Sequence, residues 1–105
     1  MFAVICRATL RPGSEENYQR SWQIIAQYFT KHRGALGSCL HKAEDGTWVA
    51  YSRWPDRKTR DASWGDHVDE STLPSEIINA IQSIKDCIEE SHPEICMEVV
   101  NDLLI

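Results

Sequence analysis

Residues 2–10 contain the pattern that most constrains the fold of this chain. Every even position in this segment is apolar, while the odd positions combine Ala3 and Ile5 with Arg7 and Thr9. An alternation of period two predicts a β-strand, because successive side chains of a strand point to opposite faces of its sheet. One face of this strand suits a protein core, and the other is partly apolar. We therefore expect a sheet whose second face also needs cover from water.

A long amphipathic helix is predicted after this strand. Residues 11–13 interrupt the alternation, and Ser14 is suited to cap a helix whose first turn contains Glu15 and Glu16. Gly34 is typical of the residue that follows a helix C-terminus. Between these limits, apolar and aromatic side chains recur at helical spacing: Tyr18, Trp22, Ile25, Phe29 and His32.

The middle of the chain predicts a β-hairpin and a short helix. Residues 36–42 and 47–54 are rich in β-forming side chains. The Asp-Gly pair at residues 45–46 lies between them and is typical of a tight hairpin turn. We expect a short helix at residues 57–64, followed by a polar loop to residue 72.

The last part of the chain predicts one more helix and one more strand. Pro74 is suited to the first turn of a helix, and Pro93 closes that element. Residues 95–103 form the final predicted strand. Four isoleucines mark one face of the helix: Ile77, Ile81, Ile84 and Ile88.

The order strand, helix, strand, strand, helix, helix, strand predicts an α+β domain of the ferredoxin-like, split βαβ type. We expect a four-stranded antiparallel sheet with helices on one face, and a single domain over residues 1–105. The last strand also has apolar side chains on both of its faces: Met97 and Val99 on one, Cys96 and Val100 on the other. Two sheets packed face to face would bury the free apolar side, so a homodimer is predicted.

The charge distribution argues against nucleic acid as a partner. The formal net charge is −5. Residues 1–55 contain 7 Lys and Arg against 4 Asp and Glu, whereas residues 56–105 contain 4 against 12. Phosphate binding depends on clustered basic side chains, and this chain has no basic stripe. The apolar start is too short for a signal peptide or a membrane span, so no membrane partner is expected.

The cysteines predict reduced thiols. They show no C-x-x-C spacing and lie in apolar or strand-like segments: Cys6, Cys39, Cys87 and Cys96. Without an export signal, such cysteines indicate a cytoplasmic protein. The histidines and cysteines show no short ligand spacing either, so no metal site is expected.

Two segments resemble the antibiotic biosynthesis monooxygenase family of dimeric α/β barrels. The first is LRPGSEE at residues 10–16, which leads into the helix that ends at Gly34. The second is CLHKAEDGTWVAYSRW at residues 39–54, a hairpin that ends in an aromatic strand and Trp54. The resemblance implies a homodimer with a pocket between the sheet and the helices of each subunit. It also implies oxygenation of a small, electron-rich aromatic compound without metal or flavin, and hence no cofactor.

Some members of this family degrade haem, and the resemblance to those members is incomplete. They use an Asn on the first strand, a Trp on the helix after the third strand, and a His about three turns further on. Cys6 stands at the Asn position, and Trp64 matches the Trp. No histidine lies between Val68 and Ser91. Haem degradation is therefore not expected.

Oxygenation without a cofactor needs an apolar pocket for the aromatic ring and a polar group that helps to remove a proton from it. A histidine titrates near neutral pH, and His67 is the candidate for proton transfer because Asp66 and Asp69 flank it. His41 and His32 are alternatives. Four residues are expected to contact the substrate: Trp64, Tyr51, Cys6 and Trp22.

These residues also have structural interpretations, which leave the function open. Trp22 lies in the apolar stripe of the first helix, where core packing is the usual role. Large aromatic side chains also suit a dimer interface, and His67 fits a solvated loop. Three functions therefore remain: a cofactor-independent monooxygenase, a small-molecule binding or stress-response dimer without catalysis, and a purely structural dimerisation module.

Overall fold

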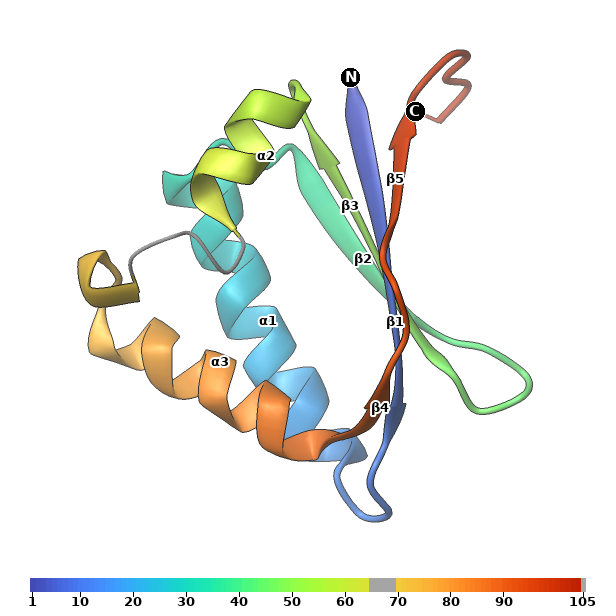
Figure 1. The fold of residues 1–105 in the computed structure, drawn as a ribbon, viewed down its shortest axis with the longest axis vertical. Coiled ribbons are helices and arrows are strands. Elements are labelled where there is room, and N and C mark those ends of the chain that lie inside the picture. Colours follow the sequence, from blue (N-terminus) through green and yellow to red (C-terminus); the bar gives the residue numbers. More distant parts are fainter. Residues whose placement is uncertain (65–69, 105) are drawn as a thin grey trace.

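A computed structural model describes residues 1–64 and 70–104 of the chain (Figure 1). None of the helices in these ranges is long and apolar enough to cross a membrane. The elements follow in this order: β1 (Phe2–Leu10), α1 (Glu15–His32), β2 (Gly37–Lys42), β3 (Trp48–Trp54), α2 (Arg57–Ser63), a short 3-10 helix (Glu70–Thr72), α3 (Ser75–Cys87), β4 (Ile88–Ser91) and β5 (Ile95–Glu98).

The strands form one antiparallel sheet with β1 near its centre. The strand order is β2-β3-β1-β4, and β5 also pairs with β1. The three α-helices lie on one side of this sheet (Figure 1). The predicted α+β, ferredoxin-like fold with helices on one face is therefore confirmed.

The end of the chain differs from the sequence prediction. We expected a helix up to Pro93 and one strand at residues 95–103, but α3 ends at Cys87 and the following residues form β4. The sheet thus has five strands in the described part of the chain, not four. Ile88 fits a helical stripe or a strand equally well, and pairing with Leu10 of β1 decides the outcome. Pro93 has no N–H to donate, and it separates β4 from β5.

The core lies between the helix-facing side of the sheet and the helices. Edge-on ring contacts join the two layers. Phe29 of α1 packs against Trp54 of β3 with ring centroids 6.3 Å apart, and Tyr18 of α1 packs against Trp48 at 5.8 Å. All four rings are buried. The predicted apolar stripe of α1 therefore faces the sheet.

The other side of the sheet, which we call the uncovered face, is apolar in its centre. The register places Ile5 opposite Tyr51 on one neighbour and opposite Ile95 on the other. Ala3 lies opposite Met97 in the same way. Ile95 is 40% exposed. Since the described helices all lie on the opposite side, this face matches the partly apolar side that the alternation in residues 2–10 predicts.

Candidate functional site

A cavity of about 420 Å³ lies between the helix-facing side of the sheet and the helices. Strands β1 and β3 line it on one side, and α1, α3 and the C-terminal end of α2 line it on the other. The largest apolar side chains in the lining are Trp22, Phe29, Trp54 and Trp64. Small-molecule sites commonly measure about 300–1,000 Å³ and have mostly apolar walls with a few polar groups. This cavity is therefore the candidate site.

Two tryptophans predicted to contact the substrate border this cavity. Trp22 projects from α1 and is half-buried. Trp64 directly follows α2, and its ring packs edge-on against Phe29, with centroids 5.3 Å apart and an interplanar angle of 90°. A half-buried ring beside a cavity retains apolar surface that a ligand can cover.

Cys6 also lines the cavity, from the helix-facing side of β1. Loss of solvation raises the pKa of its thiol, and the negative charge of Glu94 raises that pKa further, while the charge of Arg60 opposes the shift. The thiol therefore stays protonated near neutral pH. In this form it is a weak hydrogen-bond donor and a poor nucleophile.

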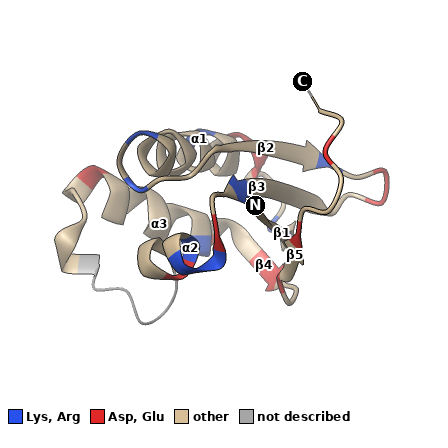
Figure 2. Cartoon of the chain, turned by 90° about the horizontal axis from the view of Figure 1, so that it is seen from above, with Lys and Arg blue, Asp and Glu red and all other residues tan. Residues whose placement is uncertain are grey.

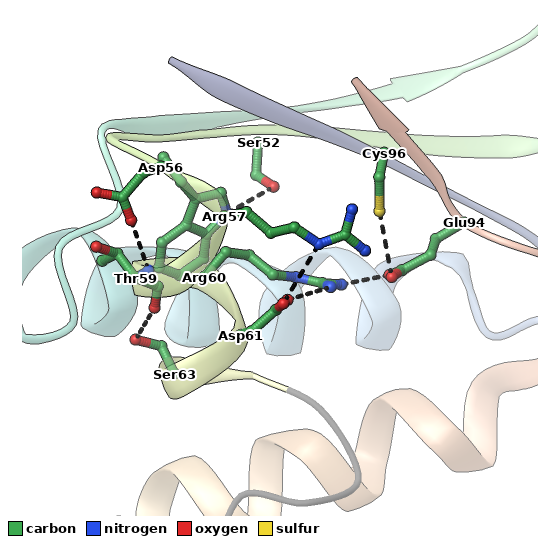
Figure 3. A network of polar contacts seen from close by, with 10 residues as sticks. Ser52, Asp56, Arg57, Thr59, Arg60, Asp61, Ser63, Glu94 and Cys96 are labelled. Carbon is green, nitrogen blue, oxygen red and sulfur yellow. Dashed lines mark hydrogen bonds and ion pairs between the residues drawn. The ribbon is translucent and has the colours of Figure 1, made fainter. Parts of the chain in front are cut away.

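Arg60 of α2 and Glu94 form an ion pair in the cavity lining (Figure 3), which also includes the charged residues Arg7 and Lys85. Arg60 donates a hydrogen bond from Nη2 to Oε2 of Glu94, and its Nη1 lies 3.3 Å from Oδ1 of Asp61. The Arg60 side chain is only 9% exposed, whereas that of Glu94, between β4 and β5, is 39% exposed. Burial tends to lower the pKa of the guanidinium, but the hydrogen bond and charge of Glu94 raise it overall.

A second cysteine completes this polar group. Cys96 of β5 lies opposite Val4 in the sheet, and its Sγ donates to Oε1 of Glu94 across 3.6 Å. Burial and the negative charge of Glu94 raise the pKa of the Cys96 thiol. Each oxygen of Glu94 thus has a partner, one a strong cationic donor and the other a weak thiol donor.

Tyr18 contributes a phenol to the cavity lining. Desolvation raises its pKa to about 12, and nearby cysteines add to the shift. The hydroxyl is therefore neutral at physiological pH, where it can donate a hydrogen bond but cannot act as a base.

The side chain of Tyr51 does not point into the cavity, as its predicted contact with the substrate would require. Tyr51 borders the cavity as part of β3, but the alternation along this strand directs its side chain to the uncovered face. There its hydroxyl accepts a hydrogen bond of 2.9 Å from Nε of Arg53, two residues along the same strand. The predicted proton-transfer residue, His67, lies outside the described residues.

Sequence reasoning missed Arg60, Glu94 and His92, all of which line the cavity. One sequence signal was available for Arg60: it precedes Trp64 by one helical turn, a spacing that places two side chains on the same face of a helix. In the structure the backbone N–H of Trp64 donates to the Arg60 carbonyl at 3.0 Å, as this spacing predicts. For Glu94 and His92 no local signal existed, because the turn between β4 and β5 was not predicted.

Helix α2 and strand β4, which both contribute to the cavity lining, carry side chains of opposite charge. Basic side chains gather on α2, and acidic ones occur on β4 (Figure 2). The ion pair between Arg60 and Glu94 bridges α2 and the turn that follows β4. Among the described residues, no group of three or more His, Cys, Asp and Glu side chains is placed to hold a metal ion.

Solved structures with the same fold cover nearly the whole chain. Rv0793 from Mycobacterium tuberculosis is 15% identical with a TM-score of 0.71, and the match covers 98% of each chain. An antibiotic biosynthesis monooxygenase is 16% identical with a TM-score of 0.70, covering 96% of this chain and 100% of that one. SnoaB from Streptomyces nogalater, a cofactor-independent oxygenase, is 12% identical with a TM-score of 0.71. The match covers 97% of this chain and 95% of SnoaB.

No protein-family model matches the sequence, and no curated protein is significantly similar to it. The likeness to the solved structures, at such low identity, shows a shared fold. The fold expected from the resemblance to antibiotic biosynthesis monooxygenases is therefore confirmed.

Proposed function

We propose that this chain is a cofactor-independent monooxygenase that acts on a small aromatic substrate of the phenol, anthrone or quinol type. The observation that carries this proposal is the composition of the cavity, which combines tryptophan and phenylalanine rings with the charged pair of Arg60 and Glu94. The shared fold with a cofactor-independent oxygenase supports it.

The chemistry requires few groups from the protein. Loss of a proton converts such a substrate into an electron-rich anion, which can itself reduce dioxygen. Aromatic walls hold the ring and limit the access of water. In this proposal Trp64, Trp22 and Cys6 contact the substrate, and Tyr51 supports the wall of β3 from the uncovered face. His67 remains a candidate for proton transfer.

A second function, ligand binding without catalysis, is favoured by one specific observation. Arg60 and Glu94 already neutralise each other, and the charge of Glu94 raises the pKa of the Cys96 thiol and so keeps it protonated. A site in which the charges are mutually compensated can hold an aromatic ligand without reacting with it.

Oxygen uptake distinguishes the two functions. We expect purified protein to consume oxygen with at least one member of a panel of anthrones and hydroquinones, measured with an oxygen electrode. Trp64→Ala should reduce the rate at subsaturating substrate, and Gln23→Ala, on an exposed position of α1, is the matched control. No uptake above background, combined with saturable quenching of tryptophan fluorescence by the same compounds, would favour the binding function.

We further propose that the protein is a homodimer in which the uncovered faces of two sheets pack together. The argument is the exposed apolar surface around Ile5, Tyr51, Ile95 and Met97, which one copy leaves open to water. A two-fold axis lets the same surface cover itself in both copies.

Sedimentation velocity at micromolar concentration tests the dimer. We expect twice the mass of the chain for the wild type, and a shift to the monomer for Ile5→Glu. Ala62→Glu places the same charge on an exposed position of α2 and should leave the dimer intact. A stable monomer in the wild type contradicts this proposal.

A cytoplasmic location is proposed from the cysteines. All four are free thiols in the structure, as expected for a reducing compartment. Their complete alkylation in freshly lysed cells, read by mass spectrometry, is the expected result, and an oxidised pair would contradict it.

A further inference from the structure

We propose that Glu94 and Arg60 form the proton-transfer pair of this cavity: the Glu94 carboxylate takes the proton from the hydroxyl of a phenolic ligand, and Arg60 then binds the resulting oxyanion. This inference rests on the proposed function, because it assigns residues to the deprotonation that oxygenation needs. It also defines the substrate class more narrowly, as ligands with an acidic aromatic hydroxyl.

The first argument is the position of the two side chains. Both line the cavity, and they reach it from different elements, Arg60 from α2 and Glu94 from the turn between β4 and β5. The guanidinium is held by Glu94 and by Asp61, whereas the Glu94 side chain is 39% exposed. A ligand hydroxyl in the cavity can therefore approach Glu94 without displacing Arg60.

The second argument is the weak donor on the other oxygen of Glu94. Oε1 accepts only the Cys96 thiol among the contacts of the described residues, at a sulfur-to-oxygen distance of 3.6 Å. A thiol is a weak hydrogen-bond donor, and a phenolic O–H is a much stronger one. A bound phenol can thus take the place of the thiol on Oε1, in the geometry from which its proton moves.

The third argument is the conservation of charge during the step. The phenolic O–H bond breaks, an O–H bond forms on Glu94, and the electron pair stays on the phenolate oxygen. Asp61 pairs with Arg60 throughout. The second anion facing Arg60 is Glu94 before the step and the ligand oxygen after it, so the net charge is unchanged and the buried guanidinium keeps both counter-ions.

The surroundings of the pair limit which ligands can react. The thiols of Cys6 and Cys96 interact with Glu94, and Asp61 pairs with both Arg60 and Arg57. The cavity lining also includes Arg7, Lys85 and His92. A carboxylate is a far weaker base than a simple phenolate. Transfer therefore needs both the attraction of Arg60 and a ligand hydroxyl that is already acidic, such as one conjugated with a carbonyl or nitro group.

Absorbance of bound 4-nitrophenol tests the step without any turnover, because its phenolate absorbs at longer wavelength than the neutral phenol. For the wild type we expect the bound phenol to ionise at a pH at least about one unit below that of the free phenol, a tenfold gain in the phenolate fraction. Arg60→Gln should abolish this gain, and Arg60→Lys, which keeps the charge, should retain part of it. Glu98→Gln, an exposed carboxylate at the end of β5, is the control and should change nothing.

Glu94→Gln separates the base from the counter-ion. It leaves the positive charge of Arg60, so it should keep or strengthen phenolate binding. The turnover number for oxygen uptake should fall about a hundredfold or more, the usual contribution of a general base, with little change in KM. Unchanged turnover in Glu94→Gln, or an unshifted 4-nitrophenol spectrum in the wild type, would overturn the inference.

The outcomes also separate this inference from the proposed function. If no aromatic compound supports oxygen uptake by the wild type but the 4-nitrophenol spectrum shifts and depends on Arg60, the oxygenase proposal fails and the proton-transfer pair stands. If uptake occurs and Glu94→Gln retains it, the oxygenase stands and the pair does not.

Discussion

Arg53 of β3 and Asp102, which lies beyond the last strand, form a two-point ion pair with nitrogen-to-oxygen distances of 2.5 and 3.2 Å. Nε of the same guanidinium donates to the Tyr51 hydroxyl. The contact ties the end of the described chain to the uncovered face. The apolar residues that follow β5 are themselves exposed, Val100 to 92% and Leu103 to 87%.

Acidification should release this last segment. The hydrogen bond from Arg53 holds the pKa of Asp102 below its ordinary value of 3.8. The pair therefore contributes fully above that value, and its contribution is lost as the pH falls through the lower, folded-state pKa. We expect the protection factors of residues 99–104, which are exchange rates corrected for the intrinsic pH dependence, to fall as the pH drops below 3.8, and to be as low at pH 7 in Asp102→Asn. Protection factors that change neither with pH nor with the substitution would contradict this.

Gly34→Ala should destabilise the protein more than Gly13→Ala. Both glycines have a positive φ, 82° and 80°, which costs an alanine about 1–2 kcal/mol. A Cβ at Gly34 would also lie 3.0 Å from Cγ2 of Thr59, whereas one at Gly13 meets nothing within 4 Å. Urea denaturation should show the difference, and Thr59→Ser, which removes Cγ2, should reduce it. Equal losses at both glycines would rule out the contact with α2.

Asp56→Ala should loosen α2 and with it the position of Arg60. Oδ1 of Asp56 accepts a hydrogen bond of 2.7 Å from the backbone N–H of Thr59, which caps the helix and lowers the pKa of the carboxyl. We expect faster amide exchange at Thr59 in Asp56→Ala than in Asp56→Asn, since Asn can also cap. Equal exchange in the two variants would exclude a role for the cap.

Alkylation of the cysteines should report the charge of Glu94. Loss of solvation and this charge raise the pKa of the Cys6 and Cys96 thiols, which lowers the fraction of reactive thiolate. Glu94→Gln should therefore speed the reaction of both with iodoacetamide at pH 8 by a few fold, as followed by mass spectrometry. Cys39, exposed on β2, is the internal control and should keep its rate. Unchanged rates at Cys96 would show that Glu94 does not act on it.

Several elements could be predicted because their signals are local. The alternation in residues 2–10 matches β1, and the stripe from Tyr18 to Phe29 matches α1, since each period appears within one segment. Gly34 could be identified as the end of that helix because its positive φ favours glycine.

Only the tertiary structure decided the rest. Whether Ile88 continues a helix or begins β4 depends on its pairing with Leu10, nearly eighty residues earlier in the chain. The ion pair of Arg60 and Glu94 depends in turn on where that strand ends, because the turn after β4 brings Glu94 to α2. The sequence by itself determined the periodic elements and the partly apolar second side of the sheet, since these follow from neighbouring residues. The charged part of the cavity arises from contacts between distant segments, which no local pattern encodes.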